Sequence, residues 1–457
     1  MFVAIPIEIA IRELEGQLWL ALHLVQKGIP CLIGGKAGVY RLIKEPGVPF
    51  VVVDKGLACF QREQYEEIIN DGGRIVELYA EGLSYLSVGI ENMAPLQPIE
   101  HCFDMMFAWG QEQEQLIRHR LSTGAADKVL TTGYPSFDLL SHEFRNYYKK
   151  QWISDKFGDD YILYNSCLGT LFSPFTFDEW QLLMPGSPSY SNEKRTDWLE
   201  AQRLEQKYFG SLKSLFKKIN ARWPTRLIVY RPHPAEDLRK VKHALRGYKN
   251  VVVVRDGGVR PWIVGCSVLI NYFCTTSIEA MMLGKPAISF RPYQGEMNTE
   301  KVSRGAIATS NEEVLRLIDY FDQNHVGDSF FKEHIDTWSP ALNNIKEKSA
   351  KIISEYIHER YFTGRFPSEC KNWTPNNYTL LKQIKHYFRQ HKDHFESKFD
   401  KKKNLLFFLK QRKIPYGSIT EKKVQKICFD LAKYIHGCPQ IKIRQVEENT
   451  VYIEPKA

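Results

Sequence analysis

The first 135 residues alternate short apolar runs of strand type with amphipathic stretches of helix type. The run FVAIPI at residues 2–7 precedes residues 10–28, in which apolar side chains recur at helical spacing as far as Gly28. Further strand-type runs occur at residues 29–35, 50–56, 74–82, 104–110 and 128–135. Strands separated by helices are joined by right-handed crossovers, which make neighbouring strands parallel. The pattern therefore predicts an α/β domain with a parallel sheet.

A second series of the same kind begins at residues 160–169, DYILYNSCLG, and is interrupted by a polar, proline-containing loop at 185–200. A helix at 201–223 follows, and then strands at residues 227–231, 250–256, 267–273 and 286–292. We therefore expect an α/β fold of two Rossmann-like domains facing a cleft, at residues 1–145 and 146–365. Residues 334–364 are expected to be helices that close the second domain or cross back to the first.

The last 92 residues differ in composition from the rest of the chain. Residues 366–457 contain 19 Lys and Arg against 9 Asp and Glu, a net charge of +10, whereas the whole chain carries +9. We expect this segment to be a basic, mainly helical C-terminal appendage. Its basic face is either simply solvated or attaches the protein to an anionic membrane surface. No motif supports binding to nucleic acid.

Composition and the N-terminus bear on localisation. No run of about 18 apolar residues occurs, so we expect no transmembrane helix. The N-terminus lacks a basic segment, and Glu8 interrupts its apolar stretch, which argues against a signal peptide. The nine cysteines show no CxxC or zinc-type spacing, which favours free thiols in a reducing compartment. We expect a cytoplasmic protein, with peripheral attachment to the inner face of the cytoplasmic membrane as an option.

Polar residues follow two strands of the second series. In open parallel sheets, ligands bind beyond the carboxyl ends of the strands. Arg231 and His233 follow one strand, in LIVYRPHP, where the flanking prolines fix the backbone that aims the histidine. An arginine and an imidazole there suit a phosphate group. The structural alternative is a half-buried histidine that bonds to neighbouring backbone.

Another strand is followed by CTTSIEA, which places three hydroxyl side chains at a helix start and a glutamate just inside it: Thr275, Thr276, Ser277 and Glu279. Hydroxyls at this position either bind an anion or cap the helix. In the first domain, Glu81 follows a strand and precedes Gly82, where it is either a catalytic carboxylate or an ordinary solvated glutamate. Arg12 lies at a helix start, where a cation is unfavourable without an anionic partner such as Glu8 or Glu15.

Eight short motifs occur in an order that resembles the bacterial surface carbohydrate biosynthesis proteins. This family is of GT-B type and related to capsule and O-antigen β-Kdo transferases and, more distantly, to CDP-glycerol glycerophosphotransferases. The motifs cover roughly residues 1–360: IEIAIREL, GIPCLIGGK, AEGL, FAWG, TGYPSFDLL, YILYNSCLG, RPHPAE and CTTSIEAMMLGKPAISFRP.

The resemblance implies a role for each matching residue. His233 and Pro234 match a motif that binds the nucleotide phosphate, and Thr275, Thr276 and Ser277 match a helix start that shares this task. Glu279 would hold the ribose or orient the helix start. Glu81 would supply the catalytic carboxylate, although Tyr79 and Ala80 stand where the family usually has further acids. Asn165, Ser166 and Cys167 also depart from the family pattern; Asn165, with Arg12, is a candidate substrate contact.

The resemblance implies a glycosyltransferase of capsule or lipopolysaccharide biosynthesis. It would transfer a Kdo-like sugar from a CMP-activated donor to a glycan or lipid-linked acceptor, with no metal and no cofactor. Arg231, His233 and the helix start would stabilise the charge that develops on the leaving nucleotide. The alternatives are a CDP-polyol phosphotransferase or a UDP-sugar 2-epimerase of the same fold, or a degenerate transferase without activity. The depleted acidic motif at residues 79–82 favours the last of these.

Overall fold

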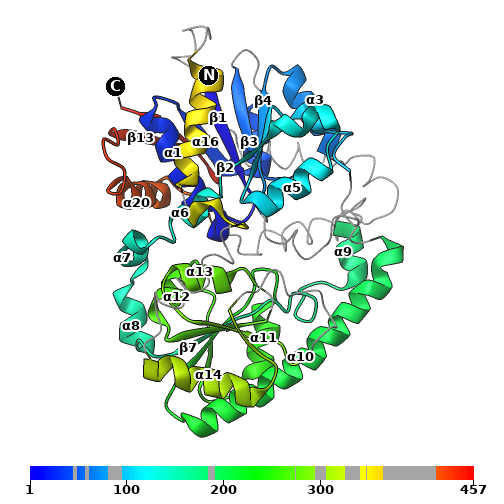
Figure 1. Ribbon diagram of the computed structural model, residues 1–457, viewed down its shortest axis with the longest axis vertical. Helices are drawn as coiled ribbons and strands as arrows, with labels where there is room; N and C mark the ends of the chain where they lie inside the picture. Colours follow the sequence, from blue (N-terminus) through cyan, green and yellow to red (C-terminus); the bar gives the residue numbers. More distant parts are fainter. Residues whose placement is uncertain are drawn as a thin grey trace. The chain divides into compact units, whose positions relative to one another are not determined.

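A computed structural model describes residues 1–44, 49–56, 61–80, 95–183, 191–272, 274–293, 305–324, 340–345, 347–363 and 418–456. The chain forms two compact units (Figure 1). The first unit combines Met1–Leu139 with Thr337–Ala457, and the second is Leu140–Asp336. Each unit contains one sheet in which most strands are parallel, so the expected α/β class with two Rossmann-like domains is confirmed.

The first unit is built on an eight-stranded sheet of order β13-β14-β2-β1-β3-β4-β5-β6. All neighbours from β2 to β6 run parallel, while β14 pairs antiparallel with β2 and β13. The strands are β1 (Phe2–Ile7), β2 (Cys31–Gly35), β3 (Phe50–Asp54), β4 (Arg74–Leu78), β5 (Met105–Ala108), β6 (Val129–Thr131), β13 (Ile441–Glu447) and β14 (Thr450–Pro455). The central strand β1 is buried along its whole length, as expected for a strand covered on both faces.

The helices of the first unit cover this sheet. They are α1 (Ala10–Gln26), α2 (Lys36–Leu42), α3 (Arg62–Asn70), α5 (Gln111–His119), α6 (Pro135–Asp138), α16 (Ser349–Ile357) and α20 (Glu421–Ala432). Shorter turns of helix are η3 (Glu100–Cys102), η4 (Thr123–Lys128), η8 (Asn343–Ile345) and the π-helix η9 (His358–Phe362). Helix α1 ends before Gly28, whose φ of 79° lies in the left-handed region that glycine tolerates best.

The described part of the C-terminal segment, residues 418–456, belongs to the first unit and is not a separate helical appendage, which corrects the expectation for this part of residues 366–457. Helix α20 buries Val424, Cys428 and Leu431 and packs beside α1. The hairpin β13–β14 extends the sheet of the first unit, with Val451 paired to Ile33 of β2 (Figure 1). The described end of the chain is therefore part of the core of the first unit. The basic stretch at residues 364–417 lies outside the described residues.

The segment before this tail also belongs to the first unit. Helix α16 contacts α1 and α6, so it crosses back rather than closing the second domain. The carboxylate of Asp138 fixes the start of α16, because it accepts hydrogen bonds from the backbone N–H groups of Ser349 (2.8 Å) and Ala350 (2.9 Å). The expected boundaries of 1–145 and 146–365 therefore differ from the structure, in which the second unit is an insertion at 140–336.

The second unit is built on a six-stranded parallel sheet of order β12-β11-β10-β7-β8-β9. Its strands are β7 (Ile162–Asn165), β8 (Ile228–Arg231), β9 (Val251–Val253), β10 (Val268–Asn271), β11 (Ala287–Phe290) and β12 (Ala306–Ala308). Its helices are η5 (His142–Phe144), α7 (Arg145–Tyr148), α8 (Gln151–Phe157), α9 (Phe177–Leu183), η7 (Asn192–Lys194), α10 (Arg195–Arg222), α11 (Leu238–Leu245), α12 (Arg260–Gly265), α13 (Thr276–Met282) and α14 (Asn311–Asn324).

Within the described residues, we find no helix that is both long enough and apolar enough to cross a membrane.

Candidate functional site

The carboxyl ends of three adjacent strands form the edge of the second unit where the sequence places its site. Asn165 ends the central strand β7 and is paired in register with Arg231 of β8 on one side and Asn271 of β10 on the other. Since the strands are parallel, these side chains and the loops behind them share one edge of the sheet. Asn165 and Arg231, which the sequence analysis singled out separately, therefore lie at the same edge of this sheet.

Asn165 is connected to the start of helix α13. Its Nδ2 donates to Oγ1 of Thr276 at 3.1 Å and contacts Sγ of Cys274 at 3.5 Å. Thr276 is only 6% exposed, so its hydroxyl is held in one place at this edge. The structure thus brings together two residues, 111 positions apart, that the sequence analysis singled out separately.

His233 is held with a defined tautomer. Its Nδ1 accepts a hydrogen bond from the backbone N–H of Ala235 at 3.2 Å, which places the proton of the neutral ring on Nε2. Its carbonyl oxygen accepts from the N–H of Glu236 (2.9 Å) and from the guanidinium of Arg255 (3.2 Å). The turn after β8 is therefore rigid, and the Nε2 atom of its half-buried histidine is a hydrogen-bond donor of the type that binds phosphate oxygens.

Arg231 has a different environment from the one expected. Its two terminal nitrogens donate to the carbonyl oxygens of Asp256 (2.9 Å) and Gly257 (2.7 Å), and its guanidinium lies over the ring of Trp262. The side chain is 6% exposed, and burial lowers its pKa to about 10, so it remains charged at neutral pH. These contacts fix the loop after β9, and we assign Arg231 a positioning role rather than direct contact with a phosphate.

Glu279 is also engaged within the protein. One of its carboxylate oxygens accepts from Nε of Arg260 at 2.8 Å, and Arg260 in turn donates to the hydroxyl of Tyr148 at 2.8 Å. Both members of the ion pair are largely buried. Of the two roles that the family resemblance implies for Glu279, this geometry favours orientation of the helix start over contact with a ribose.

The remaining hydroxyls at the start of α13 differ from each other. Ser277 is fully buried and donates to the carbonyl oxygen of Cys274 at 3.1 Å, so its hydroxyl serves the turn itself. Thr275 occupies the N-cap position, is half-buried and makes no side-chain capping bond to the helix. Thr275 and Thr276 are therefore better placed than Ser277 to contact a ligand.

Two carboxylates that the sequence analysis did not identify, the buried Glu236 and the half-buried Glu205, organise the loop after β7. Oε1 of Glu236 accepts from the hydroxyl of Ser166 (2.6 Å) and the N–H of Leu168 (2.9 Å). Glu205 accepts from the N–H groups of Thr170 (3.4 Å) and Leu171 (2.7 Å). The spacing of Glu236 from His233 in RPHPAE could have indicated its role, whereas Glu205 lies on α10 with no sequence signal. Both residues fix residues 166–171 next to Asn165.

Burial raises the pKa of both carboxyls to about 7, from an ordinary value of 4.5. The folded second unit therefore holds these protons more tightly than the unfolded chain does. Stability must then fall as the pH rises from about 4.5 to about 7 and level off above that. Glu236→Gln keeps the size of the side chain and cannot ionise. It should therefore remove the part of the pH-dependent loss of stability that Glu236 causes, on the order of 3 kcal/mol by pKa linkage.

Urea unfolding at pH 5 and at pH 8 checks this expectation. We expect Glu236→Gln to reduce the difference between the free energies of unfolding at pH 5 and at pH 8. Glu193→Gln, at an exposed position of the same unit, should leave this difference as in the wild type. Equal pH dependence in the wild type and in Glu236→Gln would show that Glu236 does not titrate in this range.

In the first unit, the predicted catalytic residue Glu81 lies outside the described residues. The chain leading to it is fixed: Trp109 donates its indole N–H to the carbonyl oxygen of Tyr79 at 2.7 Å. Two nearby carboxylates are buried and paired in register, Asp54 on β3 and Glu77 on β4. Burial and then the charge of Asp54 raise the pKa of Glu77 well above its ordinary value.

Asp54 has a purely structural environment in the described residues. It accepts hydrogen bonds from the hydroxyls of Tyr40 (2.6 Å) and Tyr65 (2.8 Å), and it is 1% exposed. Buried carboxylates that are satisfied in this way fix the packing of α2 and α3 on the sheet. The catalytic role of Glu81 stays a prediction.

A charged cluster surrounds the start of α1, where Arg12 lies. Lys55 bridges Glu8 (2.7 Å) and Glu13 (2.8 Å), and Glu13 accepts from the backbone N–H of Glu8 (3.0 Å) and of Ile9 (3.1 Å). Burial alone would raise the pKa of Glu8, but the positive charges of Lys55, Lys36 and Arg12 lower it. Arg12 itself is exposed, and its positive charge is one of the three that act on Glu8.

The described residues contain no group of three or more His, Cys, Asp or Glu side chains placed to hold a metal ion.

Comparisons with known proteins give matches only among solved structures. No family model and no curated protein matches the chain. The wall teichoic acid polymerase TagF is 13% identical, with 68% of this chain and 72% of that chain covered and a TM-score of 0.41. The UDP-GlcNAc 2-epimerase of Methanocaldococcus jannaschii, solved with UDP-GlcNAc and UDP, is 13% identical over 79% of this chain and 100% of that one, at a TM-score of 0.49. A putative UDP-N-acetylglucosamine 2-epimerase from Listeria monocytogenes is also 13% identical, over 80% and 98%, at 0.49.

Proposed function

We propose that this protein is a nucleotide-sugar-dependent glycosyltransferase of bacterial surface polysaccharide biosynthesis. In this proposal it transfers a Kdo-like sugar from a CMP-activated donor to a glycan or lipid-linked acceptor, without a metal or cofactor. The ordered set of motifs in residues 1–360 supports the family. The observation that carries the proposal is the edge of the second unit where the Nε2 donor of His233 and the linked pair Asn165–Thr276 follow adjacent strands.

The chemistry assigned to this edge is stabilisation of a leaving nucleotide. When the bond from the sugar to the phosphate breaks, negative charge develops on the phosphate oxygens. Preorganised donors aimed at that charge lower the barrier. His233 and the hydroxyls of Thr275 and Thr276 would supply these donors. Arg231, Glu236 and Glu279 would hold the loops that carry them, through the contacts described above.

The nucleotide is the part of the proposal that is tested first. His233→Ala should weaken binding of CMP by about 1.5–3 kcal/mol, the usual contribution of a hydrogen bond to a charged group. Isothermal titration calorimetry of the full chain with CMP, CDP and UDP measures this loss. His243→Ala is the matched control, because His243 is an exposed histidine on α11 of the same unit.

The same titrations separate the proposal from its alternatives. Preference for CMP supports a CMP-sugar donor, preference for CDP favours a polyol phosphotransferase, and preference for UDP favours an epimerase. If His233→Ala remains folded and binds the preferred nucleotide as tightly as the wild type does, the phosphate site has been assigned to the wrong edge.

Peripheral attachment of the basic tail to an anionic membrane stays a prediction, because most of its lysines lie in residues 364–417. In the described part of the tail, Lys422, Lys426 and Phe429 are exposed on α20, and Phe429 is 71% exposed. Basic and aromatic side chains on one helix face suit an anionic lipid surface. Salt-sensitive co-sedimentation of the full chain with anionic vesicles would test the attachment.

A further inference from the structure

Two adjoining cavities lie at the amino-terminal edge of the sheet in the second unit. Their linings include residues that lie just before the strands, such as Asp160, two residues before β7, and Ser267, directly before β10. The larger cavity has a volume of about 800 Å³ and the smaller about 310 Å³, and Asp159 and Lys285 line both. This edge is opposite the one that carries His233 and Thr276, because all six strands run in the same direction.

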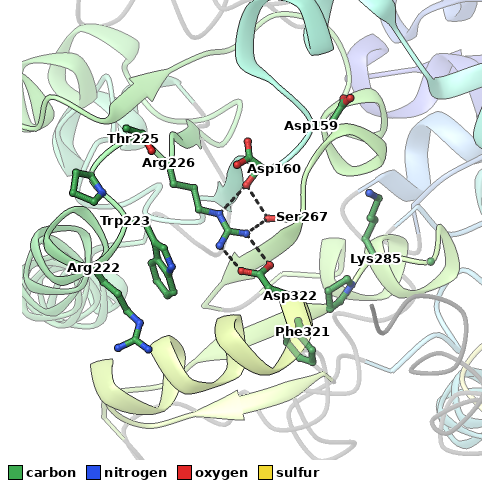
Figure 2. Close-up of a pocket in the computed structure, with 13 residues that line it drawn as sticks. Asp159, Asp160, Arg222, Trp223, Thr225, Arg226, Ser267, Lys285, Phe321 and Asp322 are labelled. Atoms are coloured by element: carbon green, nitrogen blue, oxygen red, sulfur yellow. Dashed lines mark hydrogen bonds and ion pairs between the residues drawn. The ribbon is translucent and has the colours of Figure 1, made fainter. Parts of the chain in front are cut away.

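The lining of the larger cavity has as many acidic as basic side chains, and its Arg226 is engaged in hydrogen bonds and an ion pair (Figure 2). Arg226 pairs with both carboxylate oxygens of Asp322 at 2.6 and 3.0 Å. It also donates to the carbonyl oxygen of Asp160 (2.8 Å) and the hydroxyl of Ser267 (2.6 Å). The rings of Trp223 and Phe321 add apolar surface to the lining. This cavity suits the uncharged body of a small molecule better than an isolated anion.

The smaller cavity is strongly basic. Four cations line it, Arg145, Lys149, Lys150 and Lys285, against one acid, Asp159. Lys150 donates to the carbonyl oxygen of Tyr147 at 2.7 Å. Among the residues that the structure describes, the side chains of Lys149 and Lys285 make no hydrogen bond and no ion pair. The lining of the smaller cavity therefore carries a net charge of +3, and the cavity is large enough for a phosphate group.

The position of Lys285 is fixed by its backbone. Gly284 takes a φ of 73° after helix α13, and the N–H of Lys285 donates to the carbonyl oxygen of Ala280 at 2.8 Å. Pro286 follows and begins the approach to β11. The half-buried Lys285 is thus carried by a fixed helix end rather than by a loose loop. An ammonium group that is partly removed from water gains from an anionic partner.

We propose that the smaller cavity binds the phosphate group of a small phosphorylated molecule, whose organic part extends into the larger cavity. Lys149 and Lys285 bind the phosphate oxygens, and Lys150 adds positive charge beside them. Lysine is a common phosphate ligand that acts as a point charge. The site is separate from the proposed nucleotide site, so it does not depend on the proposed function. The competing explanation is that these lysines only stabilise the carboxyl ends of α7 and α13.

Calorimetry with inorganic pyrophosphate as the probe tests the proposal on the full chain. We expect the wild type to bind pyrophosphate and the double variant Lys149→Ala, Lys285→Ala to bind it about tenfold to a hundredfold more weakly, the loss expected for charge-assisted bonds. Lys217→Ala, Lys249→Ala is the matched control, because both lysines are exposed in the same unit. Lys285→Arg keeps the charge and should retain binding, which separates loss of the ligand from loss of the fold.

Further titrations distinguish the two anion sites and the source of the phosphate. His233→Ala should bind pyrophosphate at this site as the wild type does. Binding of glucose 1-phosphate, or of vesicles containing phosphatidic acid, that is lost in the double variant supports the site and identifies a soluble or a lipid source. The proposal is overturned if the wild type does not bind pyrophosphate, or if only His233→Ala loses it. It is also overturned if the double variant has a lower melting temperature but binds pyrophosphate as tightly as the wild type does. That result is the one expected if the lysines only stabilise the helix ends.

Discussion

Replacing Glu81 with Gln is expected to lower turnover about 10²–10⁴-fold, the usual contribution of a positioned general base. In the proposed reaction the carboxylate deprotonates the acceptor hydroxyl or attacks the anomeric carbon. The amide of Gln keeps the size of the side chain and can do neither. The chain just before this residue is fixed by the hydrogen bond from the indole N–H of Trp109 to the carbonyl oxygen of Tyr79.

The measurement is the rate of nucleotide release from the donor that the calorimetry identifies. Nucleotide affinity should stay nearly unchanged in Glu81→Gln, since that affinity is assigned to His233. Glu63→Gln, at an exposed position on α3, is the matched control. Wild-type turnover in Glu81→Gln would move the catalytic role elsewhere. Absence of turnover in the wild type with every donor would instead favour the degenerate transferase, which the residues Tyr79 and Ala80 already suggest.

Replacing Asp138 with Ala is expected to destabilise the first unit by about 3–5 kcal/mol, the range for breaking a buried charged network. The side chain is 1% exposed and accepts four hydrogen bonds: from the indole N–H of Trp19 (3.1 Å), the amide of Asn344 (2.6 Å) and the N–H groups of Ser349 (2.8 Å) and Ala350 (2.9 Å). Burial raises its pKa to about 6 even though these donors oppose the shift, so it is mostly ionised at pH 8.

Urea unfolding at pH 8 measures the loss. Asp127→Ala is the control, because Asp127 is an exposed aspartate in the same unit. Asp138→Asn distinguishes loss of the hydrogen-bond acceptors from loss of side-chain volume. Asn fills the same space but turns an N–H group toward donors, so we expect this variant to be nearly as destabilising as Asp138→Ala. A loss below about 1 kcal/mol in Asp138→Ala would mean that the four donors find other partners or water.

Most strands of both sheets could be read from the sequence, but β12 and the hairpin β13–β14 could not. The runs at residues 2–7, 50–56 and 74–82 contain strands β1, β3 and β4, and the helical spacing at 10–28 contains α1. A parallel strand that is buried on both faces is a continuous apolar run, and a helix that is buried on one face has apolar residues at helical spacing. Both patterns are visible in the local sequence. The same holds for the site: parallel strands place Asn165, Arg231 and the start of α13 at one edge, whatever the rest of the chain does.

Contacts between distant parts of the chain were decided by the tertiary structure alone. Basic composition suggested a separate helical tail, yet β14 pairs with β2, more than 400 residues earlier, and α16 docks on Asp138. Arg231 was expected to face a phosphate, but it donates to the carbonyl oxygens of Asp256 and Gly257. Glu279 was expected either to hold a ribose or to orient the helix start, and it pairs with Arg260. A buried charge must be satisfied by whichever group the fold brings next to it. That partner has no fixed spacing in the sequence. The local sequence pattern therefore determined the helices and strands and the sheet edge at which the site residues lie, and only the packing of distant segments decided what each buried charge binds.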